Sequence, residues 1–511
     1  MKLTYKGSET KEIEINDRAE FYPTVAKMIV DEEAGKRLMV TASTEEGCVT
    51  YRVGVRSGTQ TIFEEINTMP DSYLSDLKPA YLTCVEPQVM EYLYDLHDHP
   101  GKFDPDTFYS DVSSRCKNAY KQYKLIPENG HVTAYYGRMA VQRGKLFGER
   151  SVEYPLSSYW PKYFEKIGKG YVDRTRLYMP EVFGQKKTES KPEKIQTVQK
   201  DVISNEASKS LFAKLKSLAK RAVEAAQVKV PVTDAIIEAA SKDVKEMRKA
   251  ARNKDVVSFN LALLDIISIL QRPVATGDGT GVKRLLAVNE SDFSGIISRE
   301  EDLLKAMEGS IAGGSSTAES GGFSQLGIEV YEATSKQKAQ VLRHLDPALH
   351  GKVKRIYRVI PQKQKRAFDA YISRNGIENV RLLWHGSRNE NWLSIIRNSL
   401  LLNPDAIITG KMFGNGIYFA PSSSKSWNYT SYHGTTWANG NSSCAYMGLY
   451  AVAYGRQYDV HFWDPSTDYK GMVFSNGCNC LHAHAGTSLR ADEIVFYDEA
   501  AVLLDYIVEF E

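Results

Sequence analysis

Two polar stretches with no apolar face divide this chain of 511 residues, and they limit what it can fold into. Residues 181–204 contain the lysine-rich run FGQKKTESKPEKIQTVQKD, and residues 311–324 overlap the run GSIAGGSSTAESGG. Segments of such composition behave as linkers. A chain of this length also exceeds one ordinary hydrophobic core, which favours roughly three or four domains. The sequence therefore predicts separate domains before, between and after the two linkers.

The charge and cysteine content narrow the class of protein. The net charge of +2 neither favours nor excludes a nucleic-acid partner. The N-terminal run MKLTYKGSETKEIEI lacks the apolar segment of a signal peptide, and no uncharged run approaches the roughly 20 residues of a membrane helix. We therefore expect an intracellular protein, nuclear if the organism is eukaryotic and cytoplasmic otherwise. The scattered cysteines suit a reducing compartment; they are Cys48, Cys84, Cys116, Cys444, Cys478 and Cys480.

The part before the first linker alternates apolar and polar residues over short runs, which predicts strands. In residues 1–103 these runs are KRLMVTA and CVTYRVGV, and PQVMEYLYDL predicts a helix; we assign this region no function. In residues 104–180 the runs AYKQYKLI and HVTAYYGRMAV flank the turn PENG, and SSYWPKYFEKIGKGY predicts a helix.

Residues 205–310 show helical periodicity. Ile236, Ala240, Val244 and Met247 repeat at helical spacing, and a second apolar stripe follows Asp255, a residue suited to cap a helix. This region predicts a small helical bundle. Residues 325–511 mix strand-like runs, such as VRLLWHG and DEIVFYD, with helix-like runs, such as KQKRAFDAYI. The mixture predicts an α+β domain with a mainly antiparallel sheet, so the fold class of the whole chain is multidomain α+β.

Three separated stretches carry polar groups toward apolar surroundings. They are His385-Gly386-Ser387, Tyr418 in GKMFGNGIYFA, and Glu493 in GTSLRADEIVFYD. A buried polar group without a partner costs about 1–3 kcal/mol. Each stretch taken alone is compatible with polar groups that neighbouring backbone satisfies.

The three stretches in this order resemble the catalytic domain of the poly(ADP-ribose) polymerase family, from about residue 325 to the end of the sequence. The likeness is carried by LLWHGSRNENWLSII, TGKMFGNGIYFAPSSSKSWNYT and TSLRADEIVFYD, and the His-Tyr-Glu signature of the family falls on His385, Tyr418 and Glu493. The resemblance implies an enzyme that cleaves NAD+ at the nicotinamide–ribose bond and transfers ADP-ribose to proteins, itself included. It implies NAD+ as substrate and no metal.

The resemblance also implies roles for individual residues. Gly386 and Ser387 would hold the nicotinamide amide, which offers one acceptor and two donors. His385 would bond the hydroxyls of the adenine-side ribose. Glu493 would stabilise the ribose as it gains oxocarbenium character, bond its 2′-hydroxyl and orient the acceptor. Further residues expected at the NAD+ site are Tyr418 and Tyr429, which would stack on the nicotinamide ring, with Lys425 and Ser426 nearby.

One departure from the family pattern concerns the adenine side of this site. Ser399 stands where the family often has glycine after the helix NWLSIIRNSL. NAD+ affinity is therefore harder to predict than the chemistry.

Two further resemblances concern control by DNA. NAYKQYKLIPENGHVTAYYGRMA, followed by YPLSSYWPKYFEKIGKGYVDRT, resembles a WGR domain, with Tyr136, Gly137 and Arg138 in place of Trp-Gly-Arg. This implies DNA-end binding through phosphate contacts and an aromatic contact to a terminal base. FNLALLDIISILQRP and ISREEDLLKAME resemble the regulatory helical domain of the family, which implies that NAD+ entry is restricted until DNA binds. The resulting expectation is a DNA-dependent ADP-ribosyltransferase acting in the DNA damage response.

Several alternatives stay open at this stage. The chain could transfer single ADP-ribose units, or act as a non-catalytic DNA-end scaffold that binds NAD+ or ADP-ribose. The lysines of residues 104–180 could form an ordinary solvated face, and the helices a plain spacer. The run CNCLHAH places Cys478, Cys480, His482 and His484 at alternate positions, but four such positions span about 20 Å and cannot surround one zinc ion without a bend. GDGTG, residues 277–281, lacks the Lys-Ser/Thr of a phosphate loop and predicts a turn.

Overall fold

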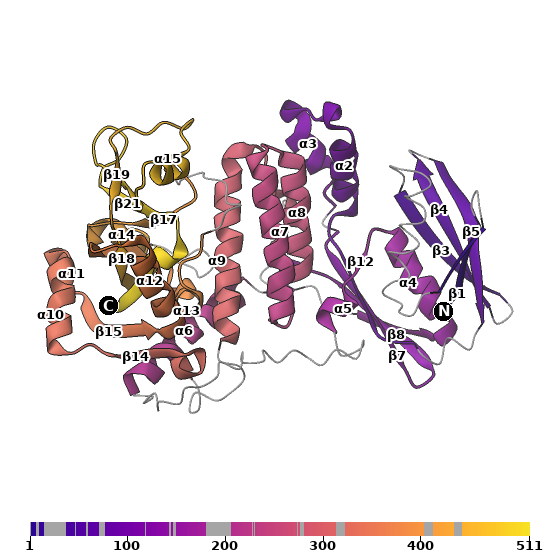
Figure 1. Ribbon diagram of the computed structural model, residues 1–511. Helices are drawn as coiled ribbons and strands as arrows, with labels where there is room; N and C mark the ends of the chain where they lie inside the picture. The colour runs from indigo at the N-terminus through magenta and orange to yellow at the C-terminus, as the bar shows by residue number, and fades with distance from the viewer. Residues whose placement is uncertain are drawn as a thin grey trace. The chain divides into compact units, whose positions relative to one another are not determined.

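A computed structural model gives the architecture of most of the chain (Figure 1). Within the part that it describes, no helix combines the length and the apolar character needed to cross a membrane. The predicted linker at 181–204, most of 311–324 and nearly all of the GDGTG turn lie outside the described residues. The structure describes residues 2–6, 10–14, 37–45, 48–57, 60–70, 77–117, 119–142, 145–146, 150–179, 206–226, 228, 230–272, 274–275, 281–312, 322–402, 412–433 and 442–511.

The chain forms two compact units that interleave along the sequence. The first comprises residues 1–188, 229–231 and 255–289, and the second comprises residues 189–228, 232–254 and 290–511. The helices between residues 206 and 311 are thus shared between the units. A single bundle over residues 205–310 therefore stays a prediction.

The first unit begins with antiparallel strands, and the strands predicted at KRLMVTA and CVTYRVGV are present. The strands β1 (Lys2–Lys6) and β2 (Thr10–Glu14) pair with each other. A separate three-stranded sheet follows; it consists of β3 (Arg37–Glu45), β4 (Cys48–Ser57) and β5 (Gln60–Pro70).

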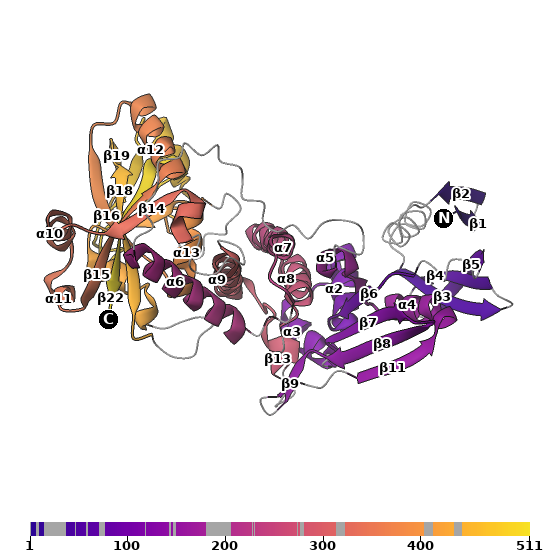
Figure 2. The ribbon, with the colours of Figure 1, turned by 90° about the horizontal axis from the view of Figure 1, so that it is seen from below.

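A five-stranded sheet in the order β11-β8-β7-β6-β12 forms the centre of the first unit (Figure 2). The predicted turn PENG joins β7 to β8, and Asn129 and Gly130 both take the positive φ that such a turn requires. Because β6 pairs with β7, the sheet takes one strand from before the predicted boundary at residue 103. The strands are β6 (Ala80–Cys84), β7 (Lys121–Glu128), β8 (His131–Arg138), β11 (Arg150–Pro155) and β12 (Val172–Asp173).

Helices cover this sheet, and a small further sheet joins them. The side chain of Asp255 caps α8 by accepting a hydrogen bond from the backbone of Ser258, as predicted. The described α-helices of the first unit are α2 (Pro87–Asp98), α3 (Pro105–Arg115), α4 (Tyr159–Gly168), α5 (Thr175–Tyr178) and α8 (Val256–Leu270). The small sheet consists of β9 (Ala140–Gln142), β10 (Lys145–Leu146) and β13 (Val274–Ala275).

In the part that the structure describes, the second unit contains three long helices and two sheets. The long helices are α6 (Glu206–Ala225), α7 (Asp234–Arg252) and α9 (Phe293–Ile311). The four residues predicted to form the apolar stripe of α7 are all buried. Helices α6 and α9 pack against each other and against residues 389–398. Residues 389–398 begin two positions after Ser387, the last residue of the His-Gly-Ser stretch.

The two sheets of the second unit confirm the predicted antiparallel α+β character of residues 325–511. Only β19 and β20 pair in parallel among the described strands of these sheets. The first sheet has the order β14-β15-β22-β18-β16, with strands β14 (Ile328–Glu332), β15 (Val353–Pro361), β22 (Val502–Phe510), β18 (Ala445–Ala453) and β16 (Val380–Gly386). The second has the order β17-β21-β20-β19, with strands β17 (Ile417–Phe419), β21 (Glu493–Phe496), β20 (Cys480–Ala483) and β19 (Gln457–Val460).

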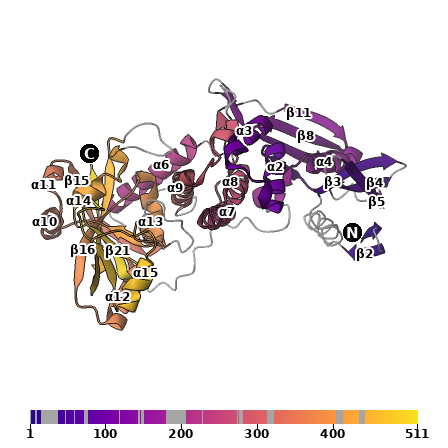
Figure 3. The ribbon, with the colours of Figure 1, turned by 90° about the horizontal axis from the view of Figure 1, so that it is seen from above.

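Short helices surround these sheets. Figure 1 and Figure 3 both show α10 and α11 on the opposite side of the sheets from α9. Every residue of β18 is buried, which accounts for its unbroken apolar sequence. The short helices are α10 (Ser335–His344), α11 (Pro347–His350), α12 (Gln362–Asn375), α13 (Trp392–Asn398), α14 (Ser423–Trp427) and α15 (Tyr469–Ser475).

Candidate active site

The end of β16 lies against the end of β17, and this contact brings the His-Gly-Ser and Tyr stretches together. The backbone N–H of Trp384 donates to the carbonyl of Ala420 at 2.9 Å, and the N–H of Ala420 donates back to the carbonyl of Trp384 at 3.0 Å. Trp384 is completely buried and anchors β16 in the core. His385 and Gly386, the last two residues of β16, therefore lie at a fixed position beside the end of β17, and Ser387 follows them.

His385 is held by its ring nitrogen and by aromatic neighbours. Its Nδ1 lies 3.1 Å from the backbone carbonyl of Tyr418 and donates a hydrogen bond to it when the ring is neutral and Nδ1 carries the proton. The rings of Phe419 and Tyr450 contact the imidazole edge-on, with centroids 5.8 and 6.0 Å away. In this tautomer Nε2 is an acceptor, which suits a ribose hydroxyl.

Gly386 occupies a position that has no room for a side chain. An added Cβ would lie 1.9 Å from the carbonyl oxygen of Ser426 and 3.3 Å from the Cβ of Tyr429. The absence of a side chain therefore allows the backbone of α14 to approach the end of β16 this closely. Ser387 follows, and its hydroxyl accepts a hydrogen bond from the amide of Asn391 at 3.2 Å.

Tyr418 and Glu493 come from neighbouring strands, because β17 pairs with β21. The Tyr418 hydroxyl donates to the carbonyl of Gly414 at 2.8 Å and accepts from the N–H of Phe413 at 3.1 Å. Burial raises the pKa of this hydroxyl, and the charge of Glu493 adds to the effect, against the opposing hydrogen bond from Phe413. Tyr418 is therefore a neutral ring fixed at its far end.

Glu493 forms an ion pair inside the site. Its Oε1 lies 2.8 Å from Nζ of Lys425, and the two side chains are only 15% and 17% exposed. Nζ of Lys425 also donates to the carbonyl of Ala491 at 2.8 Å. Helix α14 thus holds both the carboxylate and the backbone that precedes it.

The remaining predicted residues differ in exposure. Tyr429 is 57% exposed, so its ring is available to a planar partner. Partial burial and the charge of Glu493 raise the pKa of its hydroxyl. Ser426 is buried, and its hydroxyl donates to the carbonyl of Trp384 at 3.1 Å. This bond ties α14 to β16.

The structure therefore brings together all the residues predicted at the NAD+ site within the second unit. Tyr136, Gly137 and Arg138 lie on β8 in the first unit, where Tyr136 contacts the ring of Tyr123 with centroids 6.3 Å apart. The individual roles of all these residues stay predictions.

Two residues that contact this site were not predicted from the sequence. Asn391 donates to Asp302 of α9 at 2.9 Å as well as to Ser387. Asp302 is one of many acidic residues on an amphipathic helix, so no local signal distinguishes it. Asn391 lies inside the family-like run LLWHGSRNENWLSII, and its position directly before a helix was the available signal.

The cysteines and histidines of CNCLHAH do not form one group. The thiols of Cys478 and Cys480 are buried and donate to the backbone carbonyls of Gln457 and Tyr454 at 3.3 and 3.4 Å. His482 and His484 instead lie close to Asp459. All five cysteines whose side chains are described have free thiols.

Comparison with known proteins identifies the family. The family model described as the poly(ADP-ribose) polymerase catalytic domain matches residues 333–469, a range that includes His385, Tyr418 and Lys425 and ends before Glu493. A poly [ADP-ribose] polymerase-like protein of Invertebrate iridescent virus 6 is 30% identical over 161 residues, which cover 30% of this chain and 83% of the viral protein.

Two larger relatives match over shorter shares of their length. Poly [ADP-ribose] polymerase 2 of Homo sapiens is 48% identical over 75 residues, 14% of this chain and 12% of that protein. Poly [ADP-ribose] polymerase of Drosophila melanogaster is 32% identical over 181 residues, 31% of this chain and 18% of that protein. The matched part thus spans less than a fifth of either protein. Taken with the geometry of the site, these matches show that the chain belongs to the poly(ADP-ribose) polymerase family and carries its NAD+ ADP-ribosyltransferase catalytic domain.

Proposed function

We propose that this protein is a DNA-dependent NAD+ ADP-ribosyltransferase that builds poly(ADP-ribose) on protein acceptors, itself included. The observation that carries the proposal is the ion pair of Glu493 and Lys425 beside Tyr418, at the strand end that presents His385. A protein that only binds NAD+ or ADP-ribose needs no carboxylate at this position. The proposal places the protein in the response to DNA damage.

The carboxylate of Glu493 has the properties that cleavage of the nicotinamide–ribose bond requires. Departure of nicotinamide leaves positive charge on the ribose, and glycoside-cleaving enzymes place a carboxylate near such a centre. The pairing with Lys425 fixes the side chain before substrate arrives, so little reorganisation is needed during the reaction. Glu493 would also accept a hydrogen bond from the 2′-hydroxyl and orient the attacking group.

The residues around Gly386 fit a nicotinamide amide. The backbone of Gly386 offers one donor and one acceptor, and the hydroxyl of Ser387 adds a second donor. Tyr418 and Tyr429 supply aromatic faces, and such a ring pair contributes about 0.5–1.5 kcal/mol. His385 would serve the adenine-side ribose through Nε2.

Binding of DNA ends is assigned to the sheet β11-β8-β7-β6-β12 of the first unit. Aromatic side chains of this sheet lie close to lysines of α4: Nζ of Lys166 lies 4.6 Å from the ring centre of Tyr123, and Nζ of Lys162 lies 5.0 Å from that of Tyr154. Lysines of this kind bind phosphates without sequence preference, and such binding weakens with salt. Tyr136 would supply the contact to a terminal base.

Control of NAD+ entry by the helices is supported by two hydrogen bonds that link α9 to Ser387 through Asn391. Asp302 on α9 accepts from Asn391, and the same amide of Asn391 donates to Ser387. Helix α9 thereby restrains the serine expected to bind nicotinamide. We propose that loosening of α9 after DNA binding releases this restraint and admits NAD+.

The chemistry is tested with Glu493→Gln, which keeps the shape and removes the charge. Purified protein is incubated with labelled NAD+, with and without blunt DNA ends, and resolved on a denaturing gel. We expect a high-mass smear that requires DNA in the wild type, and transfer reduced by about 10²–10³-fold in the variant, with NAD+ affinity changed far less. Glu332→Gln is the matched control, because Glu332, the last residue of β14, pairs with Lys338 of α10 away from this site. Wild-type transfer by Glu493→Gln would refute the assignment, and a single sharp band in the wild type would indicate mono-transfer.

The restraint is tested with Asp302→Ala. We expect transfer in the absence of DNA to rise and the stimulation by DNA to shrink, because the bond to Asn391 is lost. Glu238→Gln, which removes an exposed carboxylate from α7, is the control for a general charge effect. Unchanged transfer without DNA in Asp302→Ala would show that this bond restrains nothing.

A further inference from the structure

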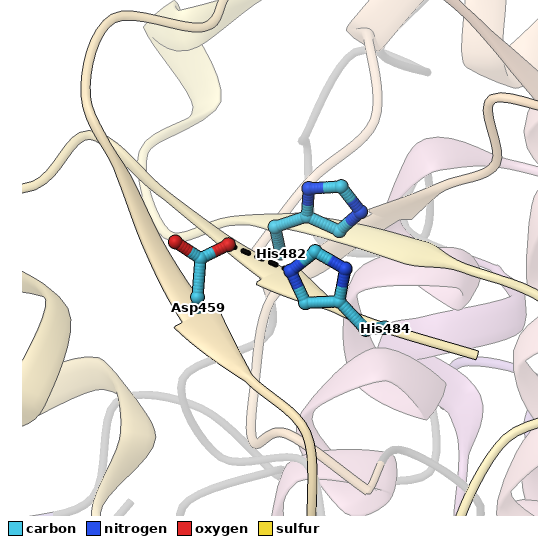
Figure 4. A group of neighbouring side chains, drawn as sticks. All are labelled: Asp459, His482 and His484. Carbon is cyan, nitrogen blue, oxygen red and sulfur yellow. Dashed lines mark hydrogen bonds and ion pairs between the residues drawn. The ribbon is translucent and has the colours of Figure 1, made fainter. Parts of the chain in front are cut away.

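A second group of polar side chains lies on β19, on β20 and directly after β20, apart from the residues assigned to NAD+. The two strands are parallel, and Asp459 is the direct partner of His482. His484 lies two residues beyond His482, so both histidines belong to the same face of the strand. Figure 4 shows the carboxylate of Asp459 and the two imidazoles gathered at one place.

The distances within this group are short. Oδ1 of Asp459 lies 2.7 Å from Nε2 of His484. The rings of His482 and His484 stack with centroids 3.9 Å apart and planes inclined by 18°. One ligand atom from each of the three residues lies within 4.8 Å of the other two. These residues are partly open to solvent, so an ion can enter.

A carboxylate from outside the two strands orients one of the imidazoles. Oδ2 of Asp492 lies 2.8 Å from Nε2 of His482, and the hydroxyl of Tyr454 lies 3.2 Å from Nδ1 of the same ring. If Nε2 carries the proton for Asp492, then Nδ1 keeps a lone pair. A carboxylate that accepts the second N–H of a histidine is the usual support of a metal-binding imidazole.

We propose that Asp459, His482 and His484 bind one divalent transition-metal ion of the zinc type. Two imidazoles and one carboxylate are a ligand set that suits zinc, cobalt or nickel and is unsuited to calcium or magnesium. The ion would replace the hydrogen bond between Asp459 and His484, with water completing its coordination. Asp492 would hold the ring of His482 from behind.

The ligand set explains why the sequence alone argued against a metal here. Four alternate positions of one strand are too widely spaced for one ion. The structure instead supplies Asp459 from the neighbouring strand, 23 residues before His482. The two cysteines of the run take no part, because their thiols bond to backbone carbonyls.

The competing explanation is two ordinary histidine–carboxylate hydrogen bonds. In that case His484 and His482 would be satisfied by Asp459 and Asp492 and would have no affinity for a metal ion. The two explanations predict different numbers of bound metal ions per chain, which can be measured. They also predict different effects of Asp492→Asn on metal affinity. Asp492 is not itself a ligand, so this change should weaken metal binding only if Asp492 supports a ligand, His482.

The experiment is a titration of chelator-treated full-length protein with Co²⁺, followed by its visible absorption, with Zn²⁺ affinity measured by competition against a chromogenic chelator. We expect one ion per chain. Asp459→Asn and His484→Gln should weaken Zn²⁺ binding by more than about 10²-fold, and Asp492→Asn by about 10–100-fold. Zn²⁺ should raise the melting temperature of the wild type and leave that of His484→Gln unchanged, since the ion would join β19 to β20.

The matched control is His99→Gln. His99 also lies 3.1 Å from a carboxylate oxygen, that of Asp95, but this pair is a single histidine with one aspartate on an exposed surface. Its replacement should leave stoichiometry and affinity unchanged. Circular dichroism of each variant establishes that it is folded. Equal Zn²⁺ affinity in the wild type and in folded His484→Gln, or no bound ion in the wild type, would overturn the proposal.

Discussion

Substitution of Gly386 by alanine tests how closely β16 and α14 must approach for this site to work. The added Cβ would lie 1.9 Å from the carbonyl oxygen of Ser426, whereas real Cβ contacts essentially never fall below 3.0 Å. The oxygen must therefore retreat by at least about 1.1 Å. It belongs to the backbone, so no rotation of a side chain can relieve the contact.

Displacement of the Ser426 backbone should affect both stability and activity. Overpacking of this kind costs about 1–3 kcal/mol of unfolding free energy. Displacement of Ser426 also displaces Lys425, the preceding residue of α14, and with it the ion pair to Glu493. A shift of about 1 Å in catalytic geometry can lower the rate about 10²-fold. We therefore expect Gly386→Ala to lose most transfer activity and to unfold at lower urea concentration.

Two measurements decide this prediction: the midpoint of urea unfolding and the rate of transfer from labelled NAD+. Gly295→Ala is the control, because Gly295 lies on an exposed face of α9 and an added Cβ there meets nothing within 4 Å. That change should stabilise the helix by up to about 1 kcal/mol. Wild-type stability and transfer in Gly386→Ala would show that the backbones do not need to be this close.

Three further predictions concern other positions. Lys425→Met should lower transfer by about 10²-fold with a smaller change in KM, measured by steady-state kinetics, because Glu493 loses the group that positions it. Ser399→Gly should raise the urea midpoint, since Ser399 has φ of 69° and ψ of −177°, a conformation that costs a non-glycine residue about 1–3 kcal/mol; an unchanged or lower midpoint would contradict this strain. Burial would raise the pKa of Glu165, but the lysines around it, Lys169 first, lower it from 4.5 to about 2. Its contribution to stability should therefore be complete above pH 4.5 and be lost as the pH falls toward 2, so the stability difference between the wild type and Glu165→Gln, measured by urea unfolding, should shrink over that range.

Short-range sequence patterns correctly predicted a turn, a helix cap and an apolar helix face, because each of these features is formed by residues close together in the sequence. The turn PENG, the cap of α8 by Asp255 and the buried stripe of α7 all follow from residues within a few positions of each other. Thr334 and Gln337 form a complete capping box at the start of α10. That box is visible in the sequence as T-x-x-Q, but the helix was not predicted. The strand β22 was also missed, although VLLDYIVEF is rich in residues that favour strands.

Long-range contacts set the limit of what the sequence could predict about the site. The residues on the NAD+ side were predicted through resemblance to a family. The sequence contains no sign that Lys425 bonds to Glu493, 68 residues later, because this contact depends on the pairing of β17 with β21. Asp302 and Asp459 were missed for the same reason, since each meets its partners only after distant elements pack together.

The start of β21 connects the two sites that this structure suggests. The carboxylate of Asp492 bonds to His482, whereas that of the next residue, Glu493, bonds to Lys425. Lys425 also bonds to the backbone carbonyl that precedes Asp492, so it holds the same short segment. In a tetrahedral zinc site the ligand atoms lie about 3.3 Å apart, whereas Oδ1 of Asp459 and Nε2 of His484 lie 2.7 Å apart, and all three ligand atoms of the proposed site lie within 4.8 Å of one another. Binding of an ion would therefore change the spacing of these side chains, and Asp492, which bonds to His482, is joined to Glu493 by one peptide bond. Because coupling between two binding sites is reciprocal, an NAD+ analogue that contacts Glu493 should change Zn²⁺ affinity by the same factor by which Zn²⁺ changes the affinity for the analogue.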